Sequence, residues 1–360
     1  MTRAILLAGR GEGFVEPNPM VGCVIVREGT IVGEGYHRRF GGDHAEVDAI
    51  KSLSDVSLAN GATAYVTLEP CCHTGKTPPC TEALISSGIA KVVVAMADPF
   101  PKVDGGGIRQ LRDAGIEVDV GACHDQATEL NRPYLKRLFL RRPWVIAKWA
   151  MSLDGRIATV TGDSQWISGE LSRAEVHRLR GRVDAIIIGA GTMSADNPTL
   201  TARPGGARVA TRVVLAGSRL PEVGSNLLRT LGDAPLLLLT SSSNFAQLDL
   251  LARMGVEIIP CESADRGQSI RLLLDELGRR EMTNVLVEGG GEVTASFAAI
   301  DELDEIHAYI SPKIIAGRAA PGPLGGDGFL ALAGTPEFRT TEVTRFDGDL
   351  RVVVRRVRLG

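Results

Sequence analysis

The sequence is short of aromatic residues, of long hydrophobic runs and of an excess of charge of either sign. Phe, Trp and Tyr make up 4% of the 360 residues, and 40 Lys and Arg nearly balance 43 Asp and Glu, for a net charge of −3. This composition lacks the basic surface and the aromatic stacking platforms that nucleic-acid-binding proteins use. No apolar run approaches the roughly 18 residues that a membrane span requires. We therefore expect neither a nucleic-acid partner nor a membrane association.

Cysteine is also scarce, with six residues, but three of them, Cys71, Cys72 and Cys80, lie close together in the sequence. Such a tight group is more typical of a metal site in a reducing compartment than of a disulfide framework. We expect a cytoplasmic protein on this ground. The other three cysteines are interpreted as small core residues.

The cysteine group belongs to a larger pattern that begins at His44-Ala45-Glu46 and continues through Pro70-Cys71 to Cys80. One imidazole and two thiolates can bind Zn²⁺ and leave the fourth tetrahedral position for water, whose pKa the metal lowers toward neutrality. In zinc deaminases the glutamate of the His-x-Glu motif moves a proton from water to the leaving amine without binding metal. We therefore predict that His44, Cys71 and Cys80 bind zinc and that Glu46 is catalytic, for hydrolytic deamination of an amino-heterocycle.

The pattern departs from the generic Pro-Cys-x-x-Cys because Cys71 and Cys80 are farther apart, and two alternatives follow. Cys72 competes with Cys71 as the ligand, although neighbouring side chains project in different directions. His73 could be a fourth protein ligand, which would close the site and make the zinc structural. That structural reading gives no reason for Glu46.

The length predicts two domains, and we place the boundary at Pro143, giving residues 1–143 and 144–360. In the first domain we predict strands at 21–26, 31–36, 63–68, 91–97 and 116–120 and helices at 44–53, 79–87, 105–114 and 123–140. In the second we predict strands at 144–150, 185–188, 212–215, 235–240, 256–259, 284–287, 305–310 and 350–358 and helices at 172–180, 245–254, 270–280 and 292–300. This alternation predicts an α/β fold with a mainly parallel sheet.

Two glycine-rich turns follow predicted strands of the second domain, at Gly189-Ala190-Gly191-Thr192 and at Gly289-Gly290-Gly291. Such turns allow a phosphate to approach the backbone closely, although a tight turn without a ligand is an equal alternative for each one. Their spacing does not match Gly-x-Gly-x-x-Gly, so a Rossmann fold is not predicted. Arg180 and Arg203 are candidate phosphate ligands. Lys148 lies in an otherwise apolar strand and is either an edge residue or an inward functional amine.

Over nearly its whole length the chain resembles the bifunctional deaminase–reductases of riboflavin biosynthesis. The matching segments are Pro17-Asn18-Pro19, Val21–Val26, Gly35-Tyr36-His37, His44-Ala45-Glu46, Thr67–Cys80, Ser152–Arg156, Ser164–Ile167, Ala195–Thr201 with Arg203, and Val287–Gly290.

The resemblance implies an α/β fold with an N-terminal cytidine-deaminase-like α/β/α domain and a C-terminal dihydrofolate-reductase-like α/β domain. It implies Zn²⁺ and NADPH as cofactors and a small phosphorylated pyrimidine as substrate. The first domain would hydrolyse an exocyclic amine of 2,5-diamino-6-ribosylamino-4(3H)-pyrimidinone 5′-phosphate. The second would use NADPH to reduce the ribosyl group of 5-amino-6-(5-phosphoribosylamino)uracil to ribityl.

The resemblance also assigns roles to residues beyond the zinc ligands. It implies that NADPH is bound by Ala150, Trp166, Thr192, Asp196, Gly290, Gly291, Glu292, Val293, Thr294, Ala295 and Ser296. It implies that substrate is bound by Asn18, His37, His73 and Lys76 in the deaminase, and by Lys148, Ser164, Arg180, Leu200, Arg203 and Glu288 in the reductase. Lys148 and Asp196 are expected closest to the sugar carbon that is reduced.

The chain departs from the family pattern at four positions. Glu16 stands where a histidine often precedes Pro-Asn-Pro, and Cys72 stands in place of a usual serine. Asn197 replaces the second aspartate of a common Asp-Asp-Pro. Glu292 places an acid in the nucleotide turn, where it is unfavourable beside a pyrophosphate unless it points away.

Two other functions fit parts of the sequence. One is a nucleoside or tRNA-editing deaminase fused to an unrelated α/β domain, which the balanced charge and the few aromatics disfavour. The other is a zinc-stabilised nucleotide-binding regulator without catalysis, which requires a closed four-ligand zinc site. Apolar strands near the C-terminus lead us to expect a homodimer or a higher homo-oligomer.

Overall fold

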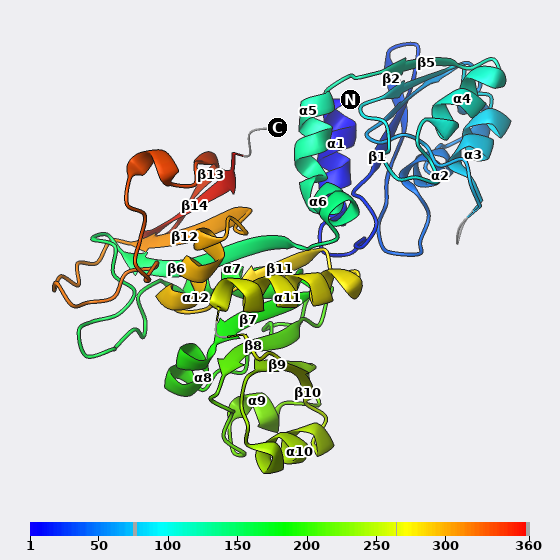
Figure 1. The fold of residues 1–360 in the computed structure, drawn as a ribbon. Helices are drawn as coiled ribbons and strands as arrows, with labels where there is room; N and C mark the ends of the chain where they lie inside the picture. The colour runs from blue at the N-terminus through cyan, green and yellow to red at the C-terminus, as the bar shows by residue number, and fades with distance from the viewer. Residues whose placement is uncertain (75–77, 264, 358–360) are drawn as a thin grey trace. The chain divides into compact units, whose positions relative to one another are not determined.

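The computed structural model describes residues 1–360 except 75–77, 264 and 358–360. The chain forms two compact units, Met1–Leu140 and Arg141–Gly360, whose elements are labelled in Figure 1. The sequence prediction placed the division three residues later, after Pro143. No helix in the described part of the chain is long and apolar enough to cross a membrane.

The first unit contains a five-stranded sheet with the strand order β2-β1-β3-β4-β5. Its first two strands form the predicted antiparallel hairpin, in which Arg27 pairs with Thr30, whereas β3, β4 and β5 run parallel to one another. The bounds are β1 (Gly22–Arg27), β2 (Thr30–Tyr36), β3 (Thr63–Val66), β4 (Lys91–Val94) and β5 (Glu117–Val120).

Six α-helices of the described residues accompany this sheet: α1 (Thr2–Ala8), α2 (Ala45–Lys51), α3 (Cys80–Ser86), α4 (Gly106–Asp113), α5 (His124–Leu130) and α6 (Arg132–Leu140), with short 3₁₀ turns at Gly9–Gly11 and Val56–Ala59. Helix α2 lies directly on β2 because Gly35 has no side chain. A Cβ atom at Gly35 would lie 2.2 Å from the backbone nitrogen of Ala49 and 2.6 Å from the carbonyl oxygen of Ala45. This contact fixes the position of the helix that carries Glu46.

The prediction of one continuous helix over 123–140 was wrong. The segment forms two helices, α5 and α6, that are interrupted at Asn131. Pro133 lacks the N–H that would continue the α5 ladder. The Asn131 side chain also makes two hydrogen bonds to the backbone of Met20, accepting from its N–H at 2.8 Å and donating to its carbonyl at 3.0 Å. The break therefore anchors the segment before β1.

The second unit contains a nine-stranded sheet with the order β10-β9-β8-β7-β11-β6-β12-β14-β13. The strands from β10 to β12 are parallel, as predicted, and β14 and β13 complete the edge in antiparallel orientation. The bounds are β6 (Trp144–Ser152), β7 (Ala185–Gly189), β8 (Thr211–Gly217), β9 (Leu236–Thr240), β10 (Glu257–Pro260), β11 (Asn284–Val287), β12 (Glu305–Ser311), β13 (Phe338–Phe346) and β14 (Asp349–Arg356).

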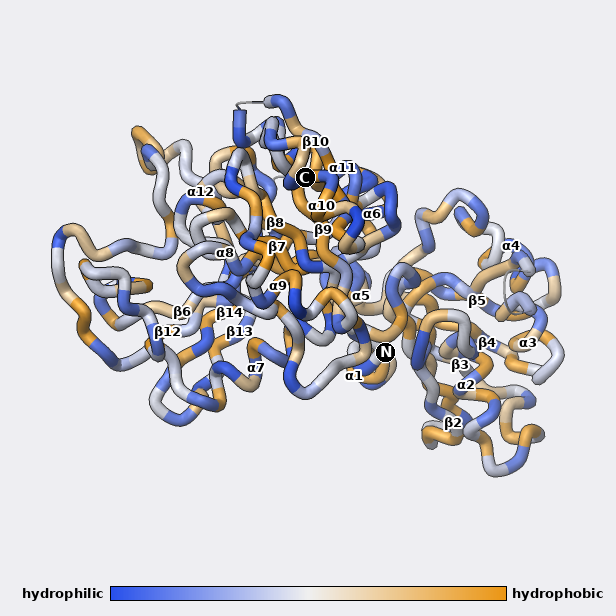
Figure 2. The backbone as a smooth tube through the Cα atoms, turned by 90° about the horizontal axis from the view of Figure 1, so that it is seen from below, coloured by the Kyte–Doolittle hydropathy of each residue, from blue (hydrophilic) through white to orange (hydrophobic). Residues whose placement is uncertain are grey.

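The central strands of this sheet are apolar on both faces, and β7, β8 and β9 form the hydrophobic centre of the unit in Figure 2. Ile186 and Ile188 pack on one face with α7 to α10, whereas Ile187 packs on the other with α11 and α12. The bounds are α7 (Glu170–Arg180), α8 (Ala190–Asp196), α9 (Asn226–Arg229), α10 (Phe245–Arg253), α11 (Arg266–Arg279) and α12 (Gly291–Ala299), with a 3₁₀ turn at Leu332–Gly334. Apolar runs buried on both faces are typical of parallel sheets.

Three elements of this unit were not predicted. They are α8, where we expected a glycine-rich turn, the short α9, and the edge strand β13. Strand β13 has an almost fully exposed face and its sequence, Phe338–Phe346, mixes charged and polar residues without an apolar alternation. The expectation of a homo-oligomer stays a prediction.

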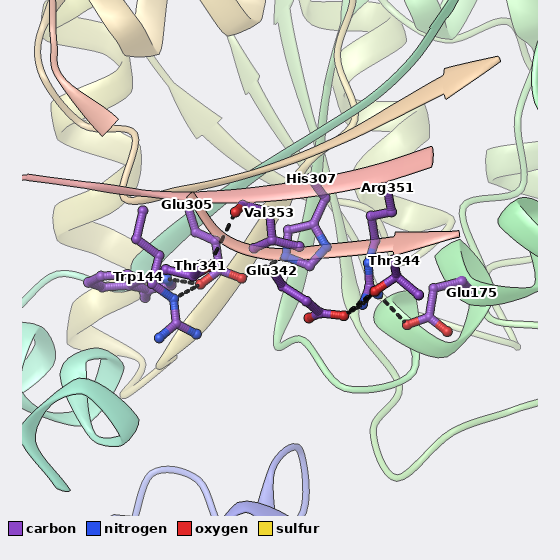
Figure 3. A network of polar contacts seen from close by, with 10 residues as sticks. Trp144, Glu175, Glu305, His307, Thr341, Glu342, Thr344, Arg351 and Val353 are labelled. Atoms are coloured by element: carbon purple, nitrogen blue, oxygen red, sulfur yellow. Dashed lines mark hydrogen bonds and ion pairs between the residues drawn. The ribbon is translucent and has the colours of Figure 1, made fainter. Parts of the chain in front are cut away.

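A polar network crosses the antiparallel edge of this sheet (Figure 3). The buried Glu305 accepts hydrogen bonds from Arg355 Nε at 2.8 Å, from Trp144 Nε1 at 3.4 Å and from His307 Nε2 at 2.6 Å. Farther along, Arg351 joins the sheet to α7 through an ion pair with Glu175. Burial opposes ionisation of Glu305, but the hydrogen bonds and charges of His307 and Arg355 outweigh it and lower its pKa to about 2.

This network makes the stability of the second unit depend on pH. Because the pKa of Glu305 is lower in the folded than in the unfolded chain, its contribution is complete above pH 5 and is lost as the pH falls toward 2. We predict that Glu305→Gln removes about 2–3 kcal/mol of this pH-dependent stability. Urea unfolding of the full chain, followed by tryptophan fluorescence, measures it, since Trp144, Trp149 and Trp166 all lie in the second unit.

The control is Glu222→Gln, which changes an exposed glutamate of the same unit. The control should keep the wild-type fall in unfolding free energy between pH 5 and 2. An unchanged pH dependence in Glu305→Gln would contradict the assignment.

Candidate active sites

The first unit brings His44, Cys71 and Cys80 together, with their donor atoms within 4.8 Å of one another. His44 is the residue before α2, Cys71 lies in the loop after β3, and Cys80 is the first residue of α3. His44 Nδ1 lies 3.2 Å from Cys80 Sγ and 3.5 Å from Cys71 Sγ. Nitrogen and sulfur ligands on a tetrahedral zinc are about 3.6 Å apart, from the usual metal–ligand bond lengths. The three donors therefore fit a zinc ion in both chemistry and spacing.

The two thiols differ in acidity. Hydrogen bonds from Cys80 and His44 lower the pKa of Cys71 to about 4, whereas the hydrogen bond with Cys71 and burial raise that of Cys80. The backbone N–H of Cys80 also points to Cys71 Sγ, at 3.4 Å. One thiolate is thus present at neutral pH, and thiolate is the form that binds metal.

Cys72 and His73 lie beside this group but are not part of it. Cys72 Sγ lies 3.9 Å from the carbonyl oxygen of Lys102 and close to Gly106. His73 is near Phe100, with ring centroids 6.4 Å apart, and its buried Nδ1 has no hydrogen-bond partner among the described residues. Across residues 1–74 and 78–357, apart from 264, the metal-binding group holds three protein donors. This number leaves one tetrahedral position for a fourth, non-protein ligand. Lys76, the remaining predicted residue of this loop, lies outside the described residues.

Glu46 lies on α2, two residues after His44, and its side chain is buried. Burial, with the nearby charge of Cys71, raises the pKa of Glu46 to about 7. A carboxyl group that titrates near neutrality can both accept and return a proton during one reaction cycle. The geometry thus matches the predicted proton carrier.

Asn18 and His37 form one hydrogen-bonded unit beside the metal group. His37 Nδ1 lies 2.8 Å from the carbonyl oxygen of Asp43, so it carries the proton, and Nε2 accepts from Asn18 Nδ2 at 3.1 Å. Burial lowers the pKa of His37, which keeps the ring neutral. The His37 ring meets the His44 ring edge-on, with centroids 5.3 Å apart. The predicted metal ligand His44 and the predicted substrate residue His37 are therefore in contact, and Asn18 joins them through its hydrogen bond to His37.

The sequence analysis gave no role to Glu69, which organises the loop that carries Cys71. Its buried carboxylate accepts hydrogen bonds from three backbone N–H groups, those of Asp98 and Gly105 at 3.2 Å and of Ile108 at 3.1 Å. Removal of this carboxylate would leave three backbone N–H groups without an acceptor in a buried site, which would cost folding free energy. The signal available in the sequence was an acidic residue within an apolar strand end, directly before Pro70-Cys71.

The second unit contains a buried group of charges at the carboxyl end of β11. Glu288 makes a bidentate ion pair with Arg180, at 2.6 and 2.8 Å, and its Oε2 lies 3.9 Å from Lys148 Nζ. Burial opposes ionisation of Glu288, but the charges of Arg180 and Lys148 lower its pKa to about 2. Burial lowers the pKa of Lys148. Lys148 is therefore an inward amine, not an edge residue.

The other predicted residues of the reductase substrate site lie in the loops around this charge group. Arg203 is exposed. Burial and the nearby charge of Arg180 are the two largest causes that lower the pKa of His177, and the charge of Arg203 is the third. Ser164 lies half-buried in the loop between β6 and α7. Leu200 is packed in the core, so only its backbone can face a ligand.

A cavity of about 590 Å³ opens at the carboxyl ends of β7, β8 and β9. Among the predicted cofactor residues, Glu292, Val293 and Ser296 line it. Thr192 and Gly290 are joined by a hydrogen bond of 3.1 Å, which links the two glycine-rich turns. The sequence analysis missed several lining residues of this cavity, namely Ser218, Arg219, Ser241 and Arg266.

The remaining predicted cofactor residues do not line the cavity. Gly291, Thr294 and Ala295 are on α12, Ala150 is on β6, and Asp196 ends α8. Trp166 is exposed in the loop before α7, where Arg173 stacks on its ring at 4.7 Å.

Two of the departures from the family pattern have local explanations. Glu292 pairs with Arg266 at 2.8 Å and accepts a hydrogen bond from the Gly326 N–H, so its charge is already compensated. Asn197 has a left-handed backbone, with φ +40°, and caps the end of α8. Asparagine tolerates that conformation better than most residues. Its side chain also accepts from the Asn226 N–H at 2.8 Å.

Comparison with known proteins gives matches over both units. The model of the RibD C-terminal domain matches residues 143–352, and that of the cytidine and deoxycytidylate deaminase zinc-binding region matches residues 1–96. The chain is 42% identical over 354 residues to riboflavin biosynthesis protein RibD of Bacillus amyloliquefaciens, which covers 98% of this chain and 94% of that protein. RibD of Escherichia coli is 37% identical over 369 residues, with 97% and 96% covered.

Solved structures are similar over the same extent. RibD of Acinetobacter baumannii has a TM-score of 0.84 and 36% identity, covering 99% of this chain and 98% of that one. A diaminohydroxyphosphoribosylaminopyrimidine deaminase/5-amino-6-(5-phosphoribosylamino)uracil reductase of Thermotoga maritima has a TM-score of 0.83 and 36% identity, covering 99% and 97%.

Adjacent cysteines provide a matched test of the metal group. We predict that Cys71→Ser loses bound zinc, because it removes one of three donors, whereas Cys72→Ser retains about one zinc per chain. Elemental analysis of the purified, dialysed full-length variants measures the metal content. Zinc loss from Cys72→Ser with retention in Cys71→Ser would show that the ligand is the other cysteine.

Proposed function

The chain belongs to the RibD family of riboflavin biosynthesis proteins, and from this premise we propose that its two units catalyse two consecutive reactions on one phosphorylated pyrimidine. The first is hydrolytic deamination of 2,5-diamino-6-ribosylamino-4(3H)-pyrimidinone 5′-phosphate. The second is NADPH-dependent reduction of the ribosyl group of 5-amino-6-(5-phosphoribosylamino)uracil to ribityl. The observation that carries the proposal is the buried Glu46 beside a group of three zinc-type donors with room for one more ligand.

In the deaminase, His44, Cys71 and Cys80 would hold zinc. A zinc ion there supplies Lewis acidity, which makes water a nucleophile near neutral pH. Glu46 takes a proton from the attacking water and delivers it to the exocyclic amine, so that the carbon–nitrogen bond breaks and ammonia leaves. A pKa of about 7 suits both transfers. Asn18 and His37, held as a neutral pair, offer the pyrimidine fixed hydrogen-bonding groups.

In the reductase, the cavity at β7 to β9 and the turn at Gly290 would hold NADPH, which supplies the hydride. Lys148 Nζ lies in a buried site, 3.9 Å from Glu288 Oε2, and we assign this amine to proton transfer at the sugar. Arg180 and Glu288 neutralise each other, so they can orient the sugar hydroxyls without adding net charge. The exposed Arg203 is available for the substrate phosphate.

The deaminase assignment is tested by Glu46→Gln. This variant keeps the side-chain volume and the three metal donors but cannot carry the proton, so we predict that zinc content is unchanged while ammonia release falls about 100- to 10,000-fold. Glu82→Gln, on the exposed side of α3, should match the wild type. Substantial ammonia release by Glu46→Gln would refute the role of Glu46.

The reductase assignment is tested by Lys148→Met. The substitution leaves the neutral pair of Arg180 and Glu288 in place and removes only the amine, so the unit should stay folded. We predict that NADPH oxidation falls by about 100-fold or more, while ammonia release is retained. Both rates are measured on the same preparation. A parallel loss of both activities, or undiminished NADPH oxidation, would contradict the assignment.

A further inference from the structure

A buried aromatic ring lies next to the amine that we assign to proton transfer in the reductase. Lys148 Nζ lies over the face of the Tyr309 ring, 6.0 Å from the ring centroid. Tyr309 is on β12, and only 1% of it is exposed. The sequence analysis gave no role to this residue.

The pairing of β6 with β12 brings the two side chains to the same face of the sheet. In this parallel pair Lys148 lies opposite His307, and Ala150 lies opposite Tyr309. Alternate residues along a strand share a face, and so do residues that lie opposite each other on neighbouring strands. Tyr309 is therefore one position farther along the face onto which Lys148 projects, where a long side chain reaches it.

The Lys148 amine itself is loosely held. Its distance from Glu288 Oε2 is 3.9 Å, which is beyond a hydrogen bond, and Glu288 already uses both oxygens for Arg180, at 2.6 and 2.8 Å. Within residues 1–74, 78–263 and 265–357, no side-chain hydrogen bond of Lys148 is present. A lysine stem is flexible, so an amine without a hydrogen bond needs another contact to fix its position.

The Tyr309 ring, in contrast, is fixed from several sides. Strand β12 is hydrogen-bonded to β6 along one edge and to β14 along the other. The ring also packs near Phe346 of β13, with centroids 6.3 Å apart. Burial raises the pKa of Tyr309 to about 12, so the phenol stays neutral at physiological pH. The face of such a ring carries negative charge density and attracts an ammonium group.

We propose that Tyr309 is a positioning residue of the reductase, whose ring face holds the protonated Lys148 amine in place beside Glu288. This inference rests on the proposed reductase function and adds the residue through which Lys148 is directed to the sugar. The ring carries the role. The hydroxyl does not, because it is buried and makes no hydrogen bond of proper geometry in the described part of the chain.

Two replacements of Tyr309 in the full-length protein separate the ring from the hydroxyl. Tyr309→Phe keeps the ring, and we expect kcat for NADPH oxidation to stay within about twofold of the wild type. Tyr309→Met fills similar space without a ring, and we expect kcat to fall about 3- to 30-fold while KM for the uracil substrate changes by less than about twofold. Ammonia release, measured on the same preparations, should be unchanged in both variants.

The matched control is Phe346→Met. It removes the ring that packs near Tyr309 and leaves the contact of Lys148 with Tyr309 in place, so kcat should be unchanged. Melting temperatures show whether each variant is folded. If Tyr309→Met is not, 3,4,5-trifluorophenylalanine is incorporated at position 309. That ring keeps nearly the size of phenylalanine but loses most of the negative charge of its face, so kcat should fall below that of Tyr309→Phe.

The outcomes are distinguishable. An unchanged kcat in folded Tyr309→Met, a change in KM alone, or equal kcat with phenylalanine and its fluorinated form would overturn the proposal. A loss in Tyr309→Phe as large as in Tyr309→Met would also overturn it, because the hydroxyl would then carry the role. Absence of NADPH oxidation by the folded wild-type protein would instead refute the reductase function, and this inference with it. A fall in kcat confined to the variants that remove or weaken the ring face supports the role given to Tyr309.

Discussion

The close approach of two helix N-termini is the constraint on which the deaminase half depends. His44 precedes α2 and Cys80 begins α3, and their donor atoms lie 3.2 Å apart although 36 residues separate them. Gly35 lets α2 lie directly on the sheet, and Glu69 binds three backbone N–H groups that hold the neighbouring loop. The same burial that assembles the donors raises the pKa of Glu46 to about 7. Burial of this site therefore both assembles the metal donors and sets the pKa that proton transfer by Glu46 requires.

The reductase half depends on a different constraint, the compensation of buried charge. Glu288 lies between Arg180 and Lys148, and this ionised carboxylate allows both cations to remain inside the unit. Glu292 is exposed, not buried, but it too has a cationic partner, Arg266 at 2.8 Å, which offsets its charge beside the cavity.

The parts of the fold and of the candidate sites that depend on local sequence patterns could be predicted. The His44-Ala-Glu46 motif with Cys71 and Cys80 indicated the metal group, and apolar runs such as 185–188 indicated the parallel sheet. The break at Asn131 had one local signal, Pro133, which the prediction of a continuous helix did not use. The other cause, a contact with Met20, is distant in sequence and could not be predicted. The cavity at the ends of β7, β8 and β9 was missed for a similar reason, since only the pairing of these strands brings the turns that line it together. The polar sequence of β13 gave no alternation, because most of its consecutive positions are exposed, so neither face of this edge strand is buried.

The measurement that tests the central claim most directly is ammonia release by the wild-type, zinc-loaded protein from the diaminopyrimidinone ribosylamino phosphate, with no nicotinamide nucleotide present. The account predicts release that stops when zinc is chelated and resumes when zinc is restored, followed by NADPH oxidation once NADPH is added. Absence of ammonia release from folded, zinc-loaded protein would contradict the account, because the deaminase group of His44, Cys71, Cys80 and Glu46 would then have another substrate or no catalytic role.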